Sequence, residues 1–112
     1  MADTLRGVPV VALTASFQTI YEVPADTTFV VGLVHLCNTL GSPVAVRMCL
    51  VPAAGSPVEG NALAWDYGVA VVAGSGILEL GRGMIWNAGD TLQVLGEGVS
   101  IQLSGIERSS TP

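Results

Sequence analysis

The sequence predicts an all-β fold, a small antiparallel β-sandwich of about eight strands with a jelly-roll-like arrangement. Short runs of β-branched and apolar residues alternate with clusters of Gly, Pro, Asn, Asp and Ser at intervals of about 8 to 12 residues. Helical periodicity is absent from the same segments. The 112 residues are expected to form a single domain, because a chain of this length supports one thin core.

The first two predicted strands cover residues 8–13 and 17–23, and residues 1–7 remain as a short amino-terminal arm. Residues 24–27 (PADT) then predict a turn, because proline fixes φ near the value required and Asp bonds the backbone two residues on. Alternation in the second strand places four side chains on one face: Phe17, Thr19, Tyr21 and Val23.

The longest predicted strand covers residues 28–38 and is apolar on both faces. Such a strand is either central in a sandwich whose outer face is covered or packed against a neighbouring subunit. Residues 40–42 (LGS) then predict a hairpin into a strand over 44–51. Alternation places Phe29, Val31, Leu33, His35 and Cys37 on one face of the first strand, and Val44, Val46, Met48 and Leu50 on one face of the second.

In the second half of the chain, residues 52–60 (PAAGSPVEG) predict a loop, and a bulge or kink is expected at Gly68. A final hairpin is expected across residues 96–98, and the polar tail 109–112 is expected to be loose. The remaining predicted elements are strands over 62–72, 77–80, 84–86, 91–95 and 99–103, with an extension of the last to residue 107 left open and a turn over 73–76.

Composition predicts that the chain associates with itself or with other proteins. Hydrophobic residues make up 50% of the sequence and charged residues only 12%, with a mean hydropathy of +0.61. Soluble domains usually carry about 25% charged residues. Half that charge leaves apolar surface without a polar cover, and extended apolar patches usually mark contacts with partners.

Charge and hydropathy patterns argue against several other classes. The net charge is −5, no lysine is present and the four arginines are scattered, so a nucleic-acid partner is not expected. No stretch of about 20 apolar residues predicts a membrane helix, and no secretory signal pattern is present. Cys37 and Cys49 fall in separate predicted strands. The sequence favours buried thiols there and leaves a disulfide open.

The residues offer no constellation for catalysis or for a cofactor. His35 is the only imidazole, and no Ser lies in a nucleophile-elbow pattern. A metal site of His35, Cys37 and Cys49 is conceivable, although an apolar strand position more often holds a packed histidine. The acidic residues fall mostly at turns and strand ends, where solubility explains them as well as paired-carboxylate or calcium chemistry does. The chain is therefore expected not to be an enzyme.

Three aromatic residues are candidates for an interface or for glycan contact. Trp65 and Tyr67 share a face at a period of two, and Trp86 lies beside a Gly-rich break. Such residues act as core or subunit-interface anchors, or as platforms that stack against sugar rings. The enrichment of Trp and Tyr at interfaces favours the first interpretation.

Four segments combine turn and strand signatures: YEVPADTTFVVGLVHLCNTLGS, AVRMCLVPAAG, WNAGDTLQVLGEG and VSIQLSGIE. Together they resemble small β-sandwich virion proteins of tailed bacteriophages, and the resemblance extends over residues 17–107. The matching positions are Val23, Pro24, Ala25, Thr27, Cys37, Asn38, Val51, Pro52, Ala53, Gly55, Asn87, Ala88, Gly89, Asp90, Leu92 and Val94.

The resemblance implies a virion component assembled in the host cytoplasm, most simply a capsid decoration or cement protein. Such a protein would bind the major capsid protein and its own copies, commonly around a three-fold axis, through apolar contacts. Residues 1–10 and 52–60 are expected to contact neighbours, because termini and loops adapt most easily to a lattice. The alternative is a subunit of the tail, neck or fibre that binds a host glycan or receptor.

Overall fold

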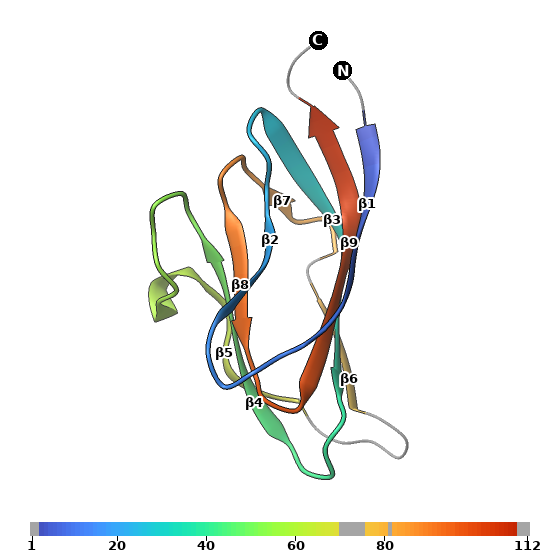
Figure 1. The fold of residues 1–112 in the computed structure, drawn as a ribbon, viewed down its shortest axis with the longest axis vertical. Coiled ribbons are helices and arrows are strands. Elements are labelled where there is room, and N and C mark those ends of the chain that lie inside the picture. The colour runs from blue at the N-terminus through green and yellow to red at the C-terminus, as the bar shows by residue number, and fades with distance from the viewer. Residues whose placement is uncertain (1–2, 70–75, 81, 110–112) are drawn as a thin grey trace.

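The computed structural model describes residues 3–69, 76–80 and 82–109 as two antiparallel sheets packed face to face (Figure 1). Sheet A has the strand order β1-β9-β3-β6, with the short β7 also paired to β3, and sheet B has the order β2-β8-β4-β5. The predicted all-β sandwich is confirmed. The elements are β1 (Asp3–Ala12), β2 (Gln18–Glu22), β3 (Thr27–Asn38), β4 (Val44–Val51), a 3-10 turn η1 (Glu59–Asn61), β5 (Ala62–Val69), β6 (Gly76–Leu80), β7 (Ile85–Trp86), β8 (Thr91–Leu95) and β9 (Val99–Ser109).

The strands pair in nested order. β1 pairs with β9, β2 with β8, β3 with β6 and β7, and β4 with β5. Successive pairs alternate between the two sheets, which is the connectivity of a jelly roll. Because β6 and β7 pair with successive stretches of β3, sheet A is four strands wide, in agreement with the expectation of about eight strands.

Both predicted short hairpins are wrong. Residues 40–42 and 96–98 join strands of opposite sheets, β3 to β4 and β8 to β9. A short Gly-containing turn suits either a hairpin or a crossing between sheets, so the spacing of strands does not distinguish them. At the first crossing the buried Asn38 amide donates to the carbonyl oxygens of Ser42 (2.9 Å) and Val69 (2.8 Å) and accepts from the Leu40 amide (2.9 Å). These bonds fix the path of the chain between the sheets.

An extra residue in β3 reverses its predicted alternation. Phe29 and Val31 face the core, the register against β9 shifts at Gly32, and Val34 is the next core residue. His35, predicted to share a face with Phe29, therefore lies on the opposite face, as do Leu33 and Cys37. A Cβ at Gly32 would lie 3.2 Å from the carbonyl oxygen of Ser104, which suits a residue without a side chain.

Bulges also correct the predictions for β2 and β5. An extra residue at Ile20 places Tyr21 in the core, whereas Thr19 is exposed, so the four residues 17, 19, 21 and 23 do not share one face. In β5 the register shifts around Asp66, which has a left-handed φ of 57°, instead of at the predicted Gly68.

The first strand is longer than predicted. It begins at Asp3, so residues 3–7, expected to belong to a short arm, pair in register with β9. The alternation predicted for 44–51 is confirmed, with Val46 and Met48 fully buried. The predicted strand residues 70–72 and most of the predicted turn 73–76 lie outside the described residues, and so do 110–112 of the predicted tail.

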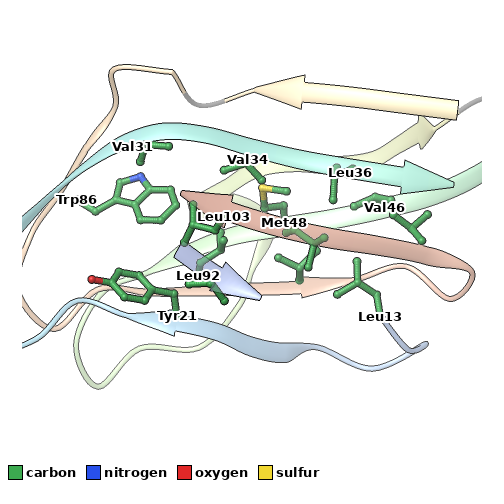
Figure 2. Close-up of a cluster of buried hydrophobic side chains, with 14 of the residues drawn as sticks. Leu13, Tyr21, Val31, Val34, Leu36, Val46, Met48, Trp86, Leu92 and Leu103 are labelled. Carbon is green, nitrogen blue, oxygen red and sulfur yellow. The ribbon is translucent and has the colours of Figure 1, made fainter. Parts of the chain in front are cut away.

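The core lies between the two sheets and receives aliphatic side chains from both (Figure 2). Aromatic rings fill one end, where Phe29 lies 4.7 Å from the Tyr21 ring and 5.6 Å from the Trp86 ring, measured between centroids. Cys37 and Cys49 are free thiols in different sheets and form no disulfide. Cys49 is buried as predicted, whereas Cys37 is partly exposed, so the prediction of a buried thiol is wrong there. The fully buried aliphatic side chains and methionine are Val23, Val31, Val34, Leu36, Val46, Met48, Val51, Leu92, Ile101 and Leu103.

Candidate functional site

Four aliphatic residues form a continuous line across the outer face of sheet A. Leu5 of β1 pairs with Ile106 of β9, Ile106 pairs with Val30 of β3, and Val30 pairs with Ile85 of β7. Directly paired residues of antiparallel strands point to the same face. Leu5 is 84% exposed, Ile85 63% and Ile106 36%, and Val30 is partly exposed. We call these four residues the apolar row.

A shallow depression of about 450 Å³ lies beside the apolar row. Its floor lacks side chains at Gly7, which pairs with Ser104, and at Gly32, the bulge residue beside Leu33, which pairs with Ser104 from the other side. Leu5 projects at its rim. The lining residues are Leu5, Arg6, Gly7, Gly32, Ser104, Gly105 and Ile106.

Two ion pairs lie at the end of sheet A near the termini, one on each face. Beside the apolar row on the outer face, the Arg108 guanidinium donates to both carboxylate oxygens of Asp3, at 3.1 and 3.2 Å, and this contact holds the pKa of Asp3 below its usual value. On the opposite face, Arg6 lies 3.9 Å from the Glu107 carboxylate and over the ring of Tyr21, at 5.9 Å. Within each pair the two charges cancel.

Tyr21 links this charged border to the core. Its hydroxyl donates a short hydrogen bond to the Glu107 carboxylate. Burial, together with this bond and the negative charge of Glu107, raises the pKa of the Tyr21 hydroxyl well above its ordinary value. The ring packs on Phe29, so the phenol joins the polar border to the aromatic end of the core.

The three aromatic candidates from the sequence lie in different environments. Trp86 is fully buried between the sheets (Figure 2). The prediction that it contacts a glycan or a partner is therefore wrong. Trp65 is partly buried, with the Arg47 guanidinium 4.2 Å from its ring centroid and the Phe17 ring at 6.5 Å. Tyr67 is 52% exposed. Only Trp65 and Tyr67 remain as surface candidates.

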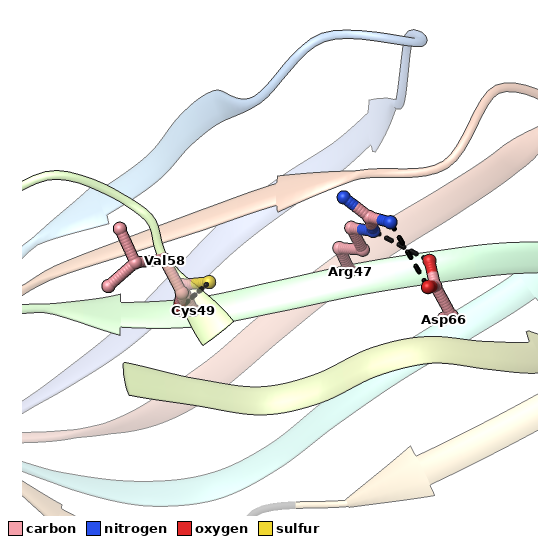
Figure 3. A network of polar contacts seen from close by, with 4 residues as sticks. All are labelled: Arg47, Cys49, Val58 and Asp66. Carbon is pink, nitrogen blue, oxygen red and sulfur yellow. Dashed lines mark hydrogen bonds and ion pairs between the residues drawn. The ribbon is translucent and has the colours of Figure 1, made fainter. Parts of the chain in front are cut away.

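The surface around Trp65 is organised by one ion pair. Arg47 donates to both carboxylate oxygens of Asp66, at 2.6 and 3.0 Å (Figure 3). The pair lowers the pKa of Asp66. The left-handed backbone of Asp66 directs its carboxylate towards the neighbouring strand, where Arg47 also stacks on Trp65. The result is a small cluster of one aromatic ring, one cation and one anion on sheet B.

The segment 52–61, which includes the loop 52–60 expected to contact neighbours, packs in part on its own sheet. Cys49 and Val51 of β4 are buried although their pairing partners in β8 point outward, because this segment lies over them. The Cys49 thiol donates to the carbonyl oxygen of Val58 at 3.5 Å (Figure 3), and burial raises its pKa. The side chain of Val58 itself is 51% exposed.

The metal site conceived from the sequence does not form. His35 and Cys37 share the outer face of sheet A, but Cys49 lies in sheet B under the 52–61 segment. In the described part of the chain, no three His, Cys, Asp or Glu side chains gather in a way that would hold a metal ion. No helix among the described residues has the length and apolar character needed to cross a membrane.

The sequence did not predict that these four residues form one apolar row. Leu5 falls in the segment expected to be an arm, and the other three residues belong to three separate strands. Only the β1-β9-β3-β7 pairing brings them into one line. The signal available in the sequence was indirect, namely the low charge that indicates uncovered apolar surface.

No protein-family model and no curated protein sequence matches this chain. Its function therefore has to be inferred from its own surfaces.

Proposed function

We propose that this chain is a non-catalytic structural protein of a bacteriophage particle, a capsid decoration or cement protein that self-associates through apolar contacts. The observation that carries the proposal is the apolar row, four aliphatic side chains in line with Leu5 and Ile85 largely exposed. Exposed apolar patches on soluble proteins usually mark contacts with partners. The low share of charged residues, 12% of the sequence, supports the same conclusion.

The assignment to a virion is supported by the sequence resemblance and by the type of fold. Jelly rolls build many viral capsid domains, although they also build lectins and cupins. A decoration protein must hold its place on a shell through permanent contacts, and permanent interfaces are the more hydrophobic class. The proposed partners are further copies of this chain and the major capsid protein.

Self-association is tested by measuring the mass of the purified full chain across a range of concentrations by analytical ultracentrifugation. The doubly substituted variant Leu5→Ser/Ile106→Ser is expected to dissociate at concentrations where the wild type is assembled. A matched control is Leu40→Ser/Val58→Ser, which removes two aliphatic residues that are 48% and 51% exposed away from the apolar row. Circular dichroism checks that both variants are folded. A wild type that is a monomer throughout would contradict the proposal.

Decoration is tested separately with shells assembled from the major capsid protein of the same genome. The wild-type chain is expected to pellet with the shells at a fixed, saturable ratio. Failure to pellet, with self-association intact, would remove the decoration role and leave the structural one.

The exposed ring of Tyr67, two residues from Trp65, favours a second candidate function, host-glycan binding by a tail, neck or fibre subunit. The adjacent Arg47–Asp66 pair supplies planar donors and acceptors for sugar hydroxyls. Glycan-array binding that disappears in Tyr67→Ala, with the oligomer unchanged, would support this alternative. Retention of binding in that variant would remove it.

A further inference from the structure

We propose that the outer face of sheet A binds a second copy of this chain around a two-fold axis, with Leu5 of each copy seated in the glycine depression of the other. This inference rests on the self-association proposed above and gives it a surface, a partner and a geometry. The observations that support it are the shape of the face and the distribution of charge around it.

The face carries both halves of a self-complementary contact. Leu5 projects from β1 with 84% of its surface exposed, and the 450 Å³ depression over Gly7 and Gly32 lies beside it. An isologous contact requires that a projection and its receptor lie on the same patch, because each copy gives one and receives the other. A three-fold ring would instead require two different patches. The geometry thus favours a two-fold contact over the three-fold axis expected from the resemblance.

Charge allows two identical copies to approach through this face. Arg108 pairs with Asp3 beside the apolar row, and Arg6 pairs with Glu107 on the opposite face, so this end of sheet A carries no net charge. The excess of five negative charges is carried by other acidic residues. Glu79 lies in β6, paired with His35 in the other half of the sheet. The remaining acids lie in sheet B, in η1 or in turns: Glu22, Asp26, Glu59, Asp66, Asp90 and Glu97.

This distribution distinguishes the apolar row from the other surfaces. Like charges placed opposite each other disfavour association, so two copies with a net charge of −5 each are repelled where surfaces with an excess of acidic residues face each other. The apolar row offers apolar area without that repulsion. A second copy is therefore the occupant that this face fits.

The contact is tested by filling the depression from within, using Gly7→Leu. A Cβ at Gly7 meets no atom within 4 Å and the backbone there is not left-handed, so the strand has room for a side chain to start at this position. In the dimer, the leucine added to each copy would fill the depression that receives the Leu5 side chain of the other copy. Both contacts would therefore be lost. The dissociation constant is expected to rise by at least about tenfold, the effect of losing one buried aliphatic side chain.

Gly68→Leu is the matched control. Gly68 is an exposed strand glycine in sheet B with the same open surroundings and without a left-handed backbone. This substitution adds the same side chain away from the proposed contact and is expected to leave the dissociation constant unchanged.

A second measurement detects the contact directly. Leu5→Cys and Gly7→Cys chains, each also carrying Cys37→Ser to remove the partly exposed thiol, are mixed and oxidised. The two-fold arrangement predicts a mixed disulfide between one chain of each kind, because the two positions face each other within reach of a disulfide.

The outcomes separate this inference from the proposed function. A monomeric wild type overturns both. A wild type that associates and is weakened by Leu5→Ser/Ile106→Ser, but not by Gly7→Leu, keeps self-association and overturns the two-fold seat. A trimeric mass without the mixed disulfide also overturns the seat. Dissociation by Gly7→Leu together with the mixed disulfide supports it.

Discussion

Trp86 fills the aromatic end of the core beside Phe29 and is fully buried. Its indole nitrogen has no hydrogen-bond partner among the described residues. An unpartnered buried donor costs about 1–3 kcal/mol, whereas burying an aromatic side chain removes about 150–250 Å² from water. The apolar area therefore outweighs the polar cost, and Trp86 stabilises the fold as a large apolar group.

Replacing Trp86 tests this balance. Trp86→Ala is expected to lower the free energy of unfolding by about 3–5 kcal/mol, because it leaves a cavity between the sheets. Trp86→Phe is expected to cost much less, since it keeps a ring and removes the unpartnered donor. Urea unfolding measures both, with the partly exposed Trp65→Ala as the control for loss of an indole. Equal losses for the Ala and Phe variants would contradict the account.

Two ion-paired surface carboxylates, those of Asp3 and Asp66, make the free energy of unfolding depend on pH. Arg108 lowers the pKa of Asp3 and Arg47 lowers that of Asp66, so as the pH falls the unfolded chain takes up protons before the folded one. The stability that these pairs contribute is present above the ordinary carboxyl pKa, about 4, and is lost as the pH falls below it.

The change that checks this pH dependence is Asp66→Asn. It is expected to make the decline in unfolding free energy between about pH 5 and pH 2 shallower, because one linked proton is removed. The effect is expected to be small, since exposed ion pairs contribute little. Glu97→Gln, in the exposed turn between β8 and β9, serves as the comparison. An unchanged slope in Asp66→Asn would argue against the linkage.

At the scale of the elements, bulges decide which side chains the strands present. Single extra residues at Gly32 and Ile20 reverse the alternation of β3 and β2, and the left-handed Asp66 redirects β5. Each bulge moves a group of side chains from one face to the other. The one extra residue, Gly32, turns the side chains of Leu33, His35 and Cys37 towards the outer face of sheet A.

At Gly105, β9 packs so closely against its neighbours that no side chain fits. A Cβ at this position would overlap the carbonyl oxygen of Val30 and the ring of Phe29. Gly105→Ala is therefore expected to lower the free energy of unfolding by about 1–3 kcal/mol or more through overpacking. Gly7→Ala, in the neighbouring strand β1 where a Cβ meets no atom within 4 Å, is expected to change stability little. Thermal unfolding compares the two, and similar losses would refute the difference in packing.

At the scale of the whole molecule, nested pairing places both chain ends together and one neutral apolar surface beside them. β1 and β9 pair along their length from Asp3↔Arg108 onward, so the first and last strands together form much of the outer face of sheet A (Figure 1). The excess of acidic residues lies in sheet B, in the turns and, at Glu79, in β6. The neutral apolar row is therefore the surface that we propose for a second copy.

Salt dependence tests this division of surfaces. Because the proposed contact is apolar and its bordering charges are paired, raising the salt from about 0.05 to 0.5 M is expected to leave self-association unchanged or to strengthen it by screening the net negative charge. Sedimentation equilibrium measures the dissociation constant at each concentration. A contact that weakens steeply with salt would point to charged groups instead of the apolar row.

Much of the fold was predictable from particular residues. The β-sandwich, the strand over 44–51 with Val46 and Met48 inward, and the free state of Cys37 and Cys49 follow from alternation, turn residues and composition. The candidate site was only partly predictable. Trp65 and Tyr67 are at the surface, but Trp86 belongs to the core, because an aromatic residue beside a turn gives no indication of which face it takes.

The sequence by itself determined the class of fold and the excess of apolar surface, since a period of two, turn residues and total charge are local or additive properties. Only the tertiary structure decided which strands cross between sheets, where alternation reverses, and that Leu5, Val30, Ile85 and Ile106 stand in one line. These features depend on register between strands up to a hundred residues apart, as in Leu5↔Ile106. Register is set by the packing of the whole core, so no local pattern in the chain contains it.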